Sequence, residues 1–75
     1  PGFVSGHSHL WQSAFRGIAA DGELWPWIRA LHHTYGKHFS DGDFYAFTRH
    51  GAFDQLVHGV TTTHNHSHFL GDDFT

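Results

Sequence analysis

Two strand-like segments, each followed by alternating histidines, constrain the fold of this chain most strongly. The first begins at residue 3 and leads to His7 and His9, and the second is the β-branched run at residues 60–63. Because side chains on a strand alternate between its two faces, His7 and His9 are expected to project together, with Ser8 on the opposite side. Two imidazoles that converge in this way can bind a metal ion. The second run is followed by histidines at the same spacing, namely His64, His66 and His68.

The residues between these segments predict helices. Ser40 and Asp43 form an S-x-x-D capping box, which predicts a helix that ends near Gly59, and a short helical turn is expected over residues 10–17. An order of strand, helical region and strand predicts an α/β fold with two parallel strands, because parallel strands need a long crossover connection. In such folds the functional groups lie at the carboxyl ends of the strands, where both histidine clusters fall. A further helix over residues 24–36 is predicted by an apolar stripe that consists of Leu24, Trp27, Ile28, Leu31 and Tyr35.

Composition excludes several classes of function. The 75 residues include no cysteine, so thiolate metal sites and disulfides are excluded. A formal net charge of -3 argues against a nucleic-acid partner, which would require a basic surface. No apolar run approaches the ~20 residues of a membrane span, so we expect no membrane partner and a cytoplasmic protein. Residues 1–75 are expected to form one partial domain of a longer protein, because the chain begins at Pro1.

Several motifs resemble one family. The segment 1–4 (PGFV) leading into His7-x-His9, and the segment 59–63 (GVTTT), resemble the first two barrel strands of the metal-dependent amidohydrolase superfamily. The similarity is to its deaminase and chlorohydrolase branch, which also has segments like 10–17 (LWQSAFRG) and 25–28 (WPWI). The resemblance implies that this chain is a strand-helices-strand fragment of a (β/α)8 TIM barrel, a fold that takes ~250 residues.

The resemblance also implies a function. His7 and His9 would bind a divalent metal, Zn or Fe(II), and water activated by that metal would hydrolyse a C–N or C–Cl bond of a heterocyclic or amidine-like small molecule. Gln12 and His66 would contact this substrate. The remaining metal ligands and the group that shuttles protons have no counterpart in residues 1–75, so no catalytic residue is assigned. We therefore expect an aminohydrolase or deaminase that needs the rest of the barrel to fold and to work, and an inactive isolated chain.

Two other functions are compatible with the same residues. A small autonomous metal-binding module without catalysis would form a cage from the histidines of both clusters, and would bind metal tightly as an isolated chain. A helical interaction piece with incidental histidines would show no metal dependence of its folding. The cage would use His7, His9, His64, His66 and His68.

Overall fold

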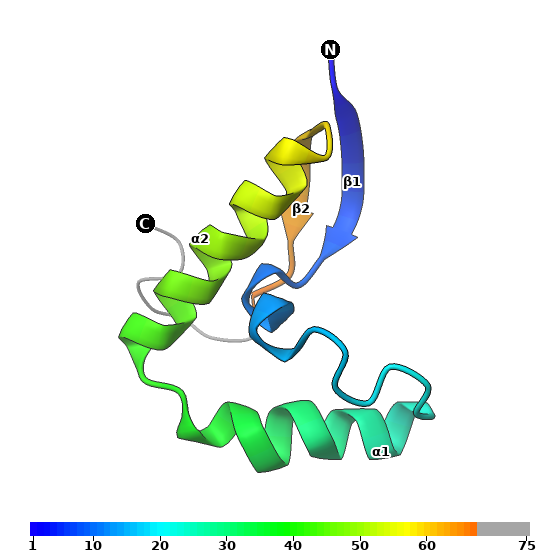
Figure 1. Cartoon of the computed structure of the whole chain (residues 1–75), viewed down its shortest axis with the longest axis vertical. Helices are drawn as coiled ribbons and strands as arrows, with labels where there is room; N and C mark the ends of the chain where they lie inside the picture. Colours follow the sequence, from blue (N-terminus) through cyan, green and yellow to red (C-terminus); the bar gives the residue numbers. More distant parts are fainter. Residues whose placement is uncertain (68–75) are drawn as a thin grey trace.

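The computed structural model describes residues 1–67 as two parallel strands joined by a helical crossover (Figure 1). The predicted α/β class and the parallel pairing are confirmed. Within the described residues, no helix is both long and apolar enough to cross a bilayer. In chain order the elements are β1 (Phe3–Ser8), the 3-10 helix η1 (Leu10–Phe15), α1 (Leu24–Ile28), the π-helix η2 (Arg29–Tyr35), the 3-10 helix η3 (Gly36–His38), α2 (Asp41–Val57) and β2 (Val60–Asn65).

The register of β1 against β2 is irregular between Ser5 and Ser8, in the stretch that contains His7. Ser5 is opposite Thr63 and Ser8 is opposite Asn65, so three steps along β1 match two steps along β2. The extra residue makes a β-bulge, which turns the side chains of the bulged strand. It places the hydroxyls of Ser5 and Ser8 on the same side of the strand, 2.7 Å apart, although residues three apart on a regular strand face opposite ways.

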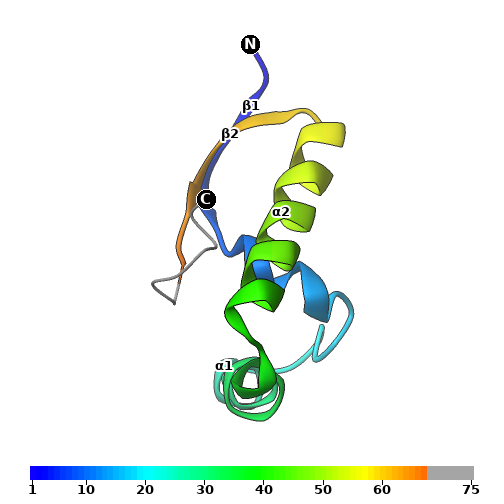
Figure 2. The same ribbon diagram turned by 90° about the vertical axis from the view of Figure 1, so that its left-hand side faces the viewer.

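Helix α2 begins and ends where the sequence predicts. The Ser40 hydroxyl accepts a hydrogen bond from the Asp43 amide, and the Asp43 carboxylate accepts one from the Ser40 amide at 2.8 Å, so the capping box is confirmed. After the helix, Gly59 has a φ of 89°, a backbone conformation that glycine adopts without strain. Helix α2 runs along one side of the strand pair (Figure 2).

The core lies between helices rather than on the strand pair. Trp11 is fully buried, and its ring packs edge-on against the rings of Phe15 and Phe44, with centroids 5.7 and 5.3 Å away. Leu31 of η2 completes this cluster. The predicted stripe over residues 24–35 is only partly correct, since Leu24 is 63% exposed and Tyr35 is 46% exposed. The helix changes to π hydrogen bonding at residue 29, so a stripe spaced for an α-helix does not stay on one face.

The helical segment from α1 to η3 lies beyond the carboxyl ends of the strands, toward which the arrows of β1 and β2 point (Figure 1). It does not cover the face of the sheet. Phe3 and Val4, near the other end of β1, are accordingly 74% and 73% exposed. Helical structure therefore lies beyond the carboxyl ends of the strands, and the opposite ends remain open.

Candidate metal-binding site

His7 and His9 converge as the strand alternation predicts. His7 is the second-last residue of β1, and His9 follows the strand directly. Their Nε2 atoms lie 3.0 Å apart. A zinc–nitrogen distance of about 2.0–2.1 Å puts two neighbouring ligand nitrogens about 2.9–3.4 Å apart for angles between square and tetrahedral. The observed separation falls in this range, so the pair fits two adjacent positions around one ion.

The tautomer of His9 follows from a hydrogen bond to the residue that follows β2. Nδ1 of His9 lies 2.8 Å from the main-chain carbonyl oxygen of His66, which can only accept, so Nδ1 carries the hydrogen and donates it. In the neutral ring, Nε2 of His9 then has the free electron pair, and Nε2 of His7 donates to it. A main-chain carbonyl that fixes the second ring nitrogen in this way is the usual support of a metal-binding histidine.

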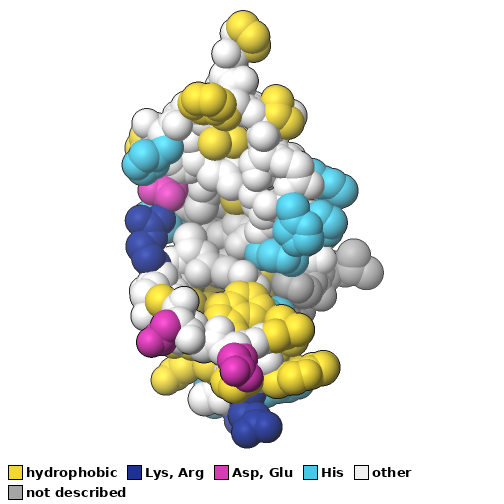
Figure 3. Space-filling model, turned by 90° about the vertical axis from the view of Figure 1, so that its right-hand side faces the viewer, with side chains coloured by type: hydrophobic (Ala, Val, Ile, Leu, Met, Phe, Trp, Pro, Cys, Tyr) yellow, Lys and Arg dark blue, Asp and Glu magenta, His cyan; other side chains and the backbone are white. Residues whose placement is uncertain are grey.

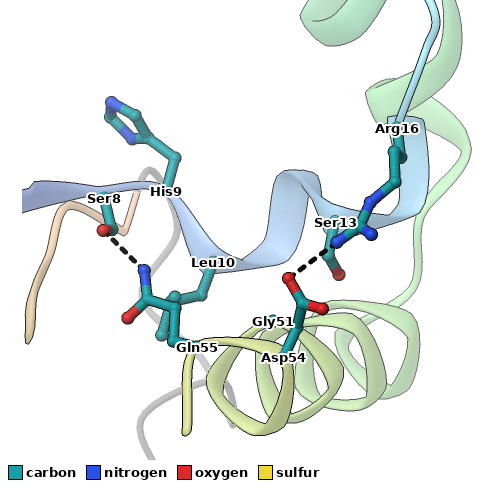
Figure 4. Close-up of a pocket in the computed structure, with 8 residues that line it drawn as sticks. All are labelled: Ser8, His9, Leu10, Ser13, Arg16, Gly51, Asp54 and Gln55. Carbon is teal, nitrogen blue, oxygen red and sulfur yellow. Dashed lines mark hydrogen bonds and ion pairs between the residues drawn. The ribbon is translucent and has the colours of Figure 1, made fainter. Parts of the chain in front are cut away.

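Further hydrogen bonds hold the two strand ends together at this position. The His66 amide donates to the Ser8 carbonyl at 2.7 Å, and the Leu10 amide donates to Oδ1 of Asn65 at 3.1 Å. On the other side of β1, Nε2 of Gln55 in α2 donates to the Ser8 hydroxyl at 2.8 Å. Figure 4 shows the result: Ser8 points toward α2 and the ring of His9 points away from it.

His64 near the end of β2 and His66 just after it join the same surface. The ring of His66 is stacked on that of His7 with centroids 4.1 Å apart, and His64 is stacked on His66 at 4.3 Å. Figure 3 shows histidine side chains gathered on one flank of the molecule. Despite this crowding, no set of three or more histidine, aspartate or glutamate side chains in residues 1–67 has the geometry to hold a metal ion. His68 lies outside the described residues.

The crowding affects the charge of the cluster. Burial, together with the imidazoles of His7, His64 and His9, lowers the pKa of His66. A lowered pKa favours the neutral ring, and only the neutral ring can bind a metal ion or accept a hydrogen bond. The neighbouring imidazoles and burial therefore favour the neutral form of His66.

Gln12 lies near the pair and has a partner that the sequence did not indicate. Nε2 of Gln12 donates to Nε2 of His32 at 3.2 Å, and the His32 ring packs edge-on against Trp11 with centroids 5.3 Å apart. Burial is the main cause that lowers the pKa of His32, followed by His33 and His9. The sequence gives no sign that His32 faces the strand ends, because polar residues in helices are mostly exposed. The π-helix and the position of the segment beyond the strand ends bring it to the site instead, and neither has a local sequence signal.

A polar pocket of about 230 Å³ lies on the other side of the β1 end, between η1 and α2 (Figure 4). Arg16 and Asp54 form an ion pair of 2.7 Å across it. The Ser13 hydroxyl donates to the Phe47 carbonyl at 2.8 Å. These groups hold η1 against α2, and we assign them a structural role.

The lowered pKa values of His32 and His66 predict that the metal-free chain loses stability in acid. A folded-state pKa below the ordinary value of about 6.5 means that the unfolded chain takes up protons first as the pH falls. The contribution is complete above about pH 6.5 and is lost as the pH falls toward the folded-state values. Urea unfolding at pH 7.5, 6.5 and 5.5, with a chelator present, should give a decreasing free energy of unfolding. The double variant His32→Asn, His66→Asn should show a shallower decrease, and a decrease equal to that of the wild type would contradict the assignment.

The fold and the site together define a mixed α/β chain with two imidazoles converging at the carboxyl end of a parallel strand. Comparisons with protein-family models, with curated proteins and with solved structures found no match. The geometry of the histidine pair and the motifs in the sequence are therefore what indicates the function of the chain.

Proposed function

We propose that this chain is the first strand, helical crossover and second strand of a (β/α)8 barrel hydrolase of the amidohydrolase type. In this proposal the whole protein is a cytoplasmic deaminase or related aminohydrolase that acts on a C–N or C–Cl bond of a heterocyclic or amidine-like small molecule. The observation that carries the proposal is the 3.0 Å separation of the Nε2 atoms of His7 and His9, at the strand end where such barrels place their active sites.

The exposure of the strands supports a larger fold. Parallel sheets in α/β proteins are normally covered on both faces. Here, four of the six residues in β1 and three of the six in β2 are exposed. Additional strands and helices of a barrel would cover this surface, which the described residues leave open.

His7 and His9 would hold a divalent ion, Zn or Fe(II), since imidazole is a suitable ligand for both. The ion would supply Lewis acidity and a water activated at neutral pH. This chain contributes two neutral ligands that leave the charge of the ion intact, and the His66 carbonyl keeps the His9 ring in its ligating tautomer. Catalytic zinc sites generally have three protein ligands, so further ligands would come from the rest of the barrel.

Gln12 and His66 would contact the substrate. Nε2 of Gln12 uses one hydrogen on His32, which leaves its carbonyl oxygen and second amide hydrogen for a ring that carries a donor beside an acceptor. The His66 ring is stacked on the rings of both His7 and His64, so the edge of the ring would meet a substrate next to the proposed metal position. Both side chains are half-buried. Gln12 lies shortly after the end of β1, and His66 directly follows β2.

The first test is metal binding by the 75-residue chain. We expect weak, saturable binding of one Zn²⁺ or Co²⁺ by isothermal titration at pH 7.5. His7→Ala and His9→Ala should each reduce the affinity by more than the ~10-fold that loss of an outer partner typically costs. His50→Ala removes an exposed histidine of α2 and is the matched control, with an expected affinity equal to that of the wild type.

Other outcomes would contradict parts of the proposal. An affinity unchanged by His7→Ala and His9→Ala would exclude the pair as ligands. Tight binding that is lost on replacing His64 and His66 would favour the autonomous metal-binding cage. Release of ammonia from cytosine or guanine by the isolated chain would contradict the need for the rest of the barrel. The coding sequence on both sides of this segment should contain further strand-terminal histidines and an aspartate.

A further inference from the structure

We infer that Asn65 is a positioning residue for His9, because its side chain binds the amide that follows His9 and so fixes the backbone from which this ligand projects. The inference rests on the proposed metal-binding role of His9. It adds a residue that contacts neither metal nor substrate and that the sequence motifs did not single out.

Helix η1 starts directly after His9. This helix begins at Leu10, and His9 is its N-cap residue, but the His9 side chain makes no capping hydrogen bond. The first amides of a helix have no acceptor within the helix and need one from elsewhere. Oδ1 of Asn65 accepts from the Leu10 amide at 3.1 Å, so the cap comes from the neighbouring strand, 55 residues further along the chain.

The backbone that Asn65 contacts is buried. Leu10 is 8% exposed, and α2 packs closely against its backbone at Gly51. Water therefore has little access to the Leu10 residue, and an amide left without an acceptor in such a position is costly. If Asn65 lost its side chain, the backbone at residues 9 and 10 would have to shift toward another acceptor.

Three hydrogen bonds join the ends of the two strands at this position. Two of them use main-chain atoms of His66, which accepts from His9 and donates to the Ser8 carbonyl. Neither bond uses the side chain at position 66. The bond from Leu10 to Asn65 depends on the side chain at position 65, so it can be removed by a substitution that changes neither proposed metal ligand.

The position of Asn65 also argues against a merely tolerated surface residue. Asparagine is depleted in strands, yet Asn65 is the last residue of β2 and half-buried. Its register partner is Ser8, the residue just before His9. The side chain therefore crosses from one strand end to the other at the height of the histidine pair.

The test measures metal affinity and metal geometry in the 75-residue chain. Asn65→Ala should weaken Zn²⁺ binding by about 10- to 100-fold, the range found for outer partners of metal ligands, and should alter the visible absorption of bound Co²⁺. Asn65→Asp keeps an oxygen at the same position and should bind at least as tightly as the wild type. Gln55→Leu removes a different side-chain hydrogen bond, to Ser8, and should leave the Co²⁺ spectrum unchanged.

The outcomes separate this inference from the proposed function. Wild-type affinity in Asn65→Ala, with circular dichroism unchanged, would overturn the inference and leave the proposed function standing. If Asn65→Ala does not fold, Asn65→Asp decides: at least wild-type affinity supports the inference, and a tenfold loss overturns it. Absence of metal binding by the wild-type chain would overturn the proposed function and this inference together.

Discussion

Replacing Trp11 with alanine is expected to unfold most of the chain. Trp11 has no exposed surface, and its ring contacts the rings of Phe15, His32, Phe39 and Phe44. Truncating a buried tryptophan typically costs about 3–5 kcal/mol. Even a chain of this length that folds independently has a total stability of only about 4–11 kcal/mol, at about 0.05–0.15 kcal/mol per residue. The loss is therefore comparable with the whole stability.

Far-ultraviolet circular dichroism during urea unfolding would measure this effect. The matched control is Trp25→Ala, because Trp25 is 73% exposed and lies in α1, outside the core cluster. This control should unfold within about 0.5 kcal/mol of the wild type, as is usual for surface positions. Equal midpoints for the two tryptophan variants would show that the core is not centred on Trp11.

Replacing Gly51 with alanine should destabilise the chain even though alanine is the better helix former. In an open helix position this change would stabilise by about 1 kcal/mol. A Cβ at Gly51 would instead overlap with the carbonyl oxygen of Leu10 and lie 3.2 Å from its Cα. Overpacking of this kind costs about 1–3 kcal/mol, and a backbone neighbour cannot rotate away. The two terms together give a net loss of up to about 2 kcal/mol in the free energy of unfolding.

The same helix offers a matched control for this prediction. At Gly42 an added Cβ would meet only the Ser40 hydroxyl at 3.7 Å, an ordinary contact. Gly42→Ala should therefore raise the free energy of unfolding, by about 0.5–1 kcal/mol. A Gly51→Ala variant as stable as Gly42→Ala would contradict the close approach of α2 to Leu10.

Local signals predicted much of the fold. The capping box at Ser40, the glycine at residue 59 and the β-branched run before His64 each depend on a few neighbouring residues, and each marks an element boundary close to the one in the structure. The convergence of His7 and His9 was also predictable, because strand alternation requires nothing from the rest of the chain.

Features that depend on tertiary contacts were not predictable in this way. The bulge between Ser5 and Ser8 arises from pairing with β2, and the change to π hydrogen bonding at residue 29 has no local pattern. The bond between Asn65 and Leu10 joins residues 55 positions apart. His32 reaches Gln12 because the helical segment lies beyond the strand ends. These contacts support the proposed site, and sequence periodicity contains no information about them.

The hydrogen bond between His7 and His9 has a consequence for how an ion would enter. Nε2 of His7 holds the hydrogen of this bond, and the two nitrogens already have a spacing suitable for two ligands of one ion. Binding of an ion through both Nε2 atoms would require His7 to move that hydrogen to its other ring nitrogen, with no net release of protons. In the proposed site this exchange of tautomer, and not a rearrangement of the main chain, is the change that ion binding would require.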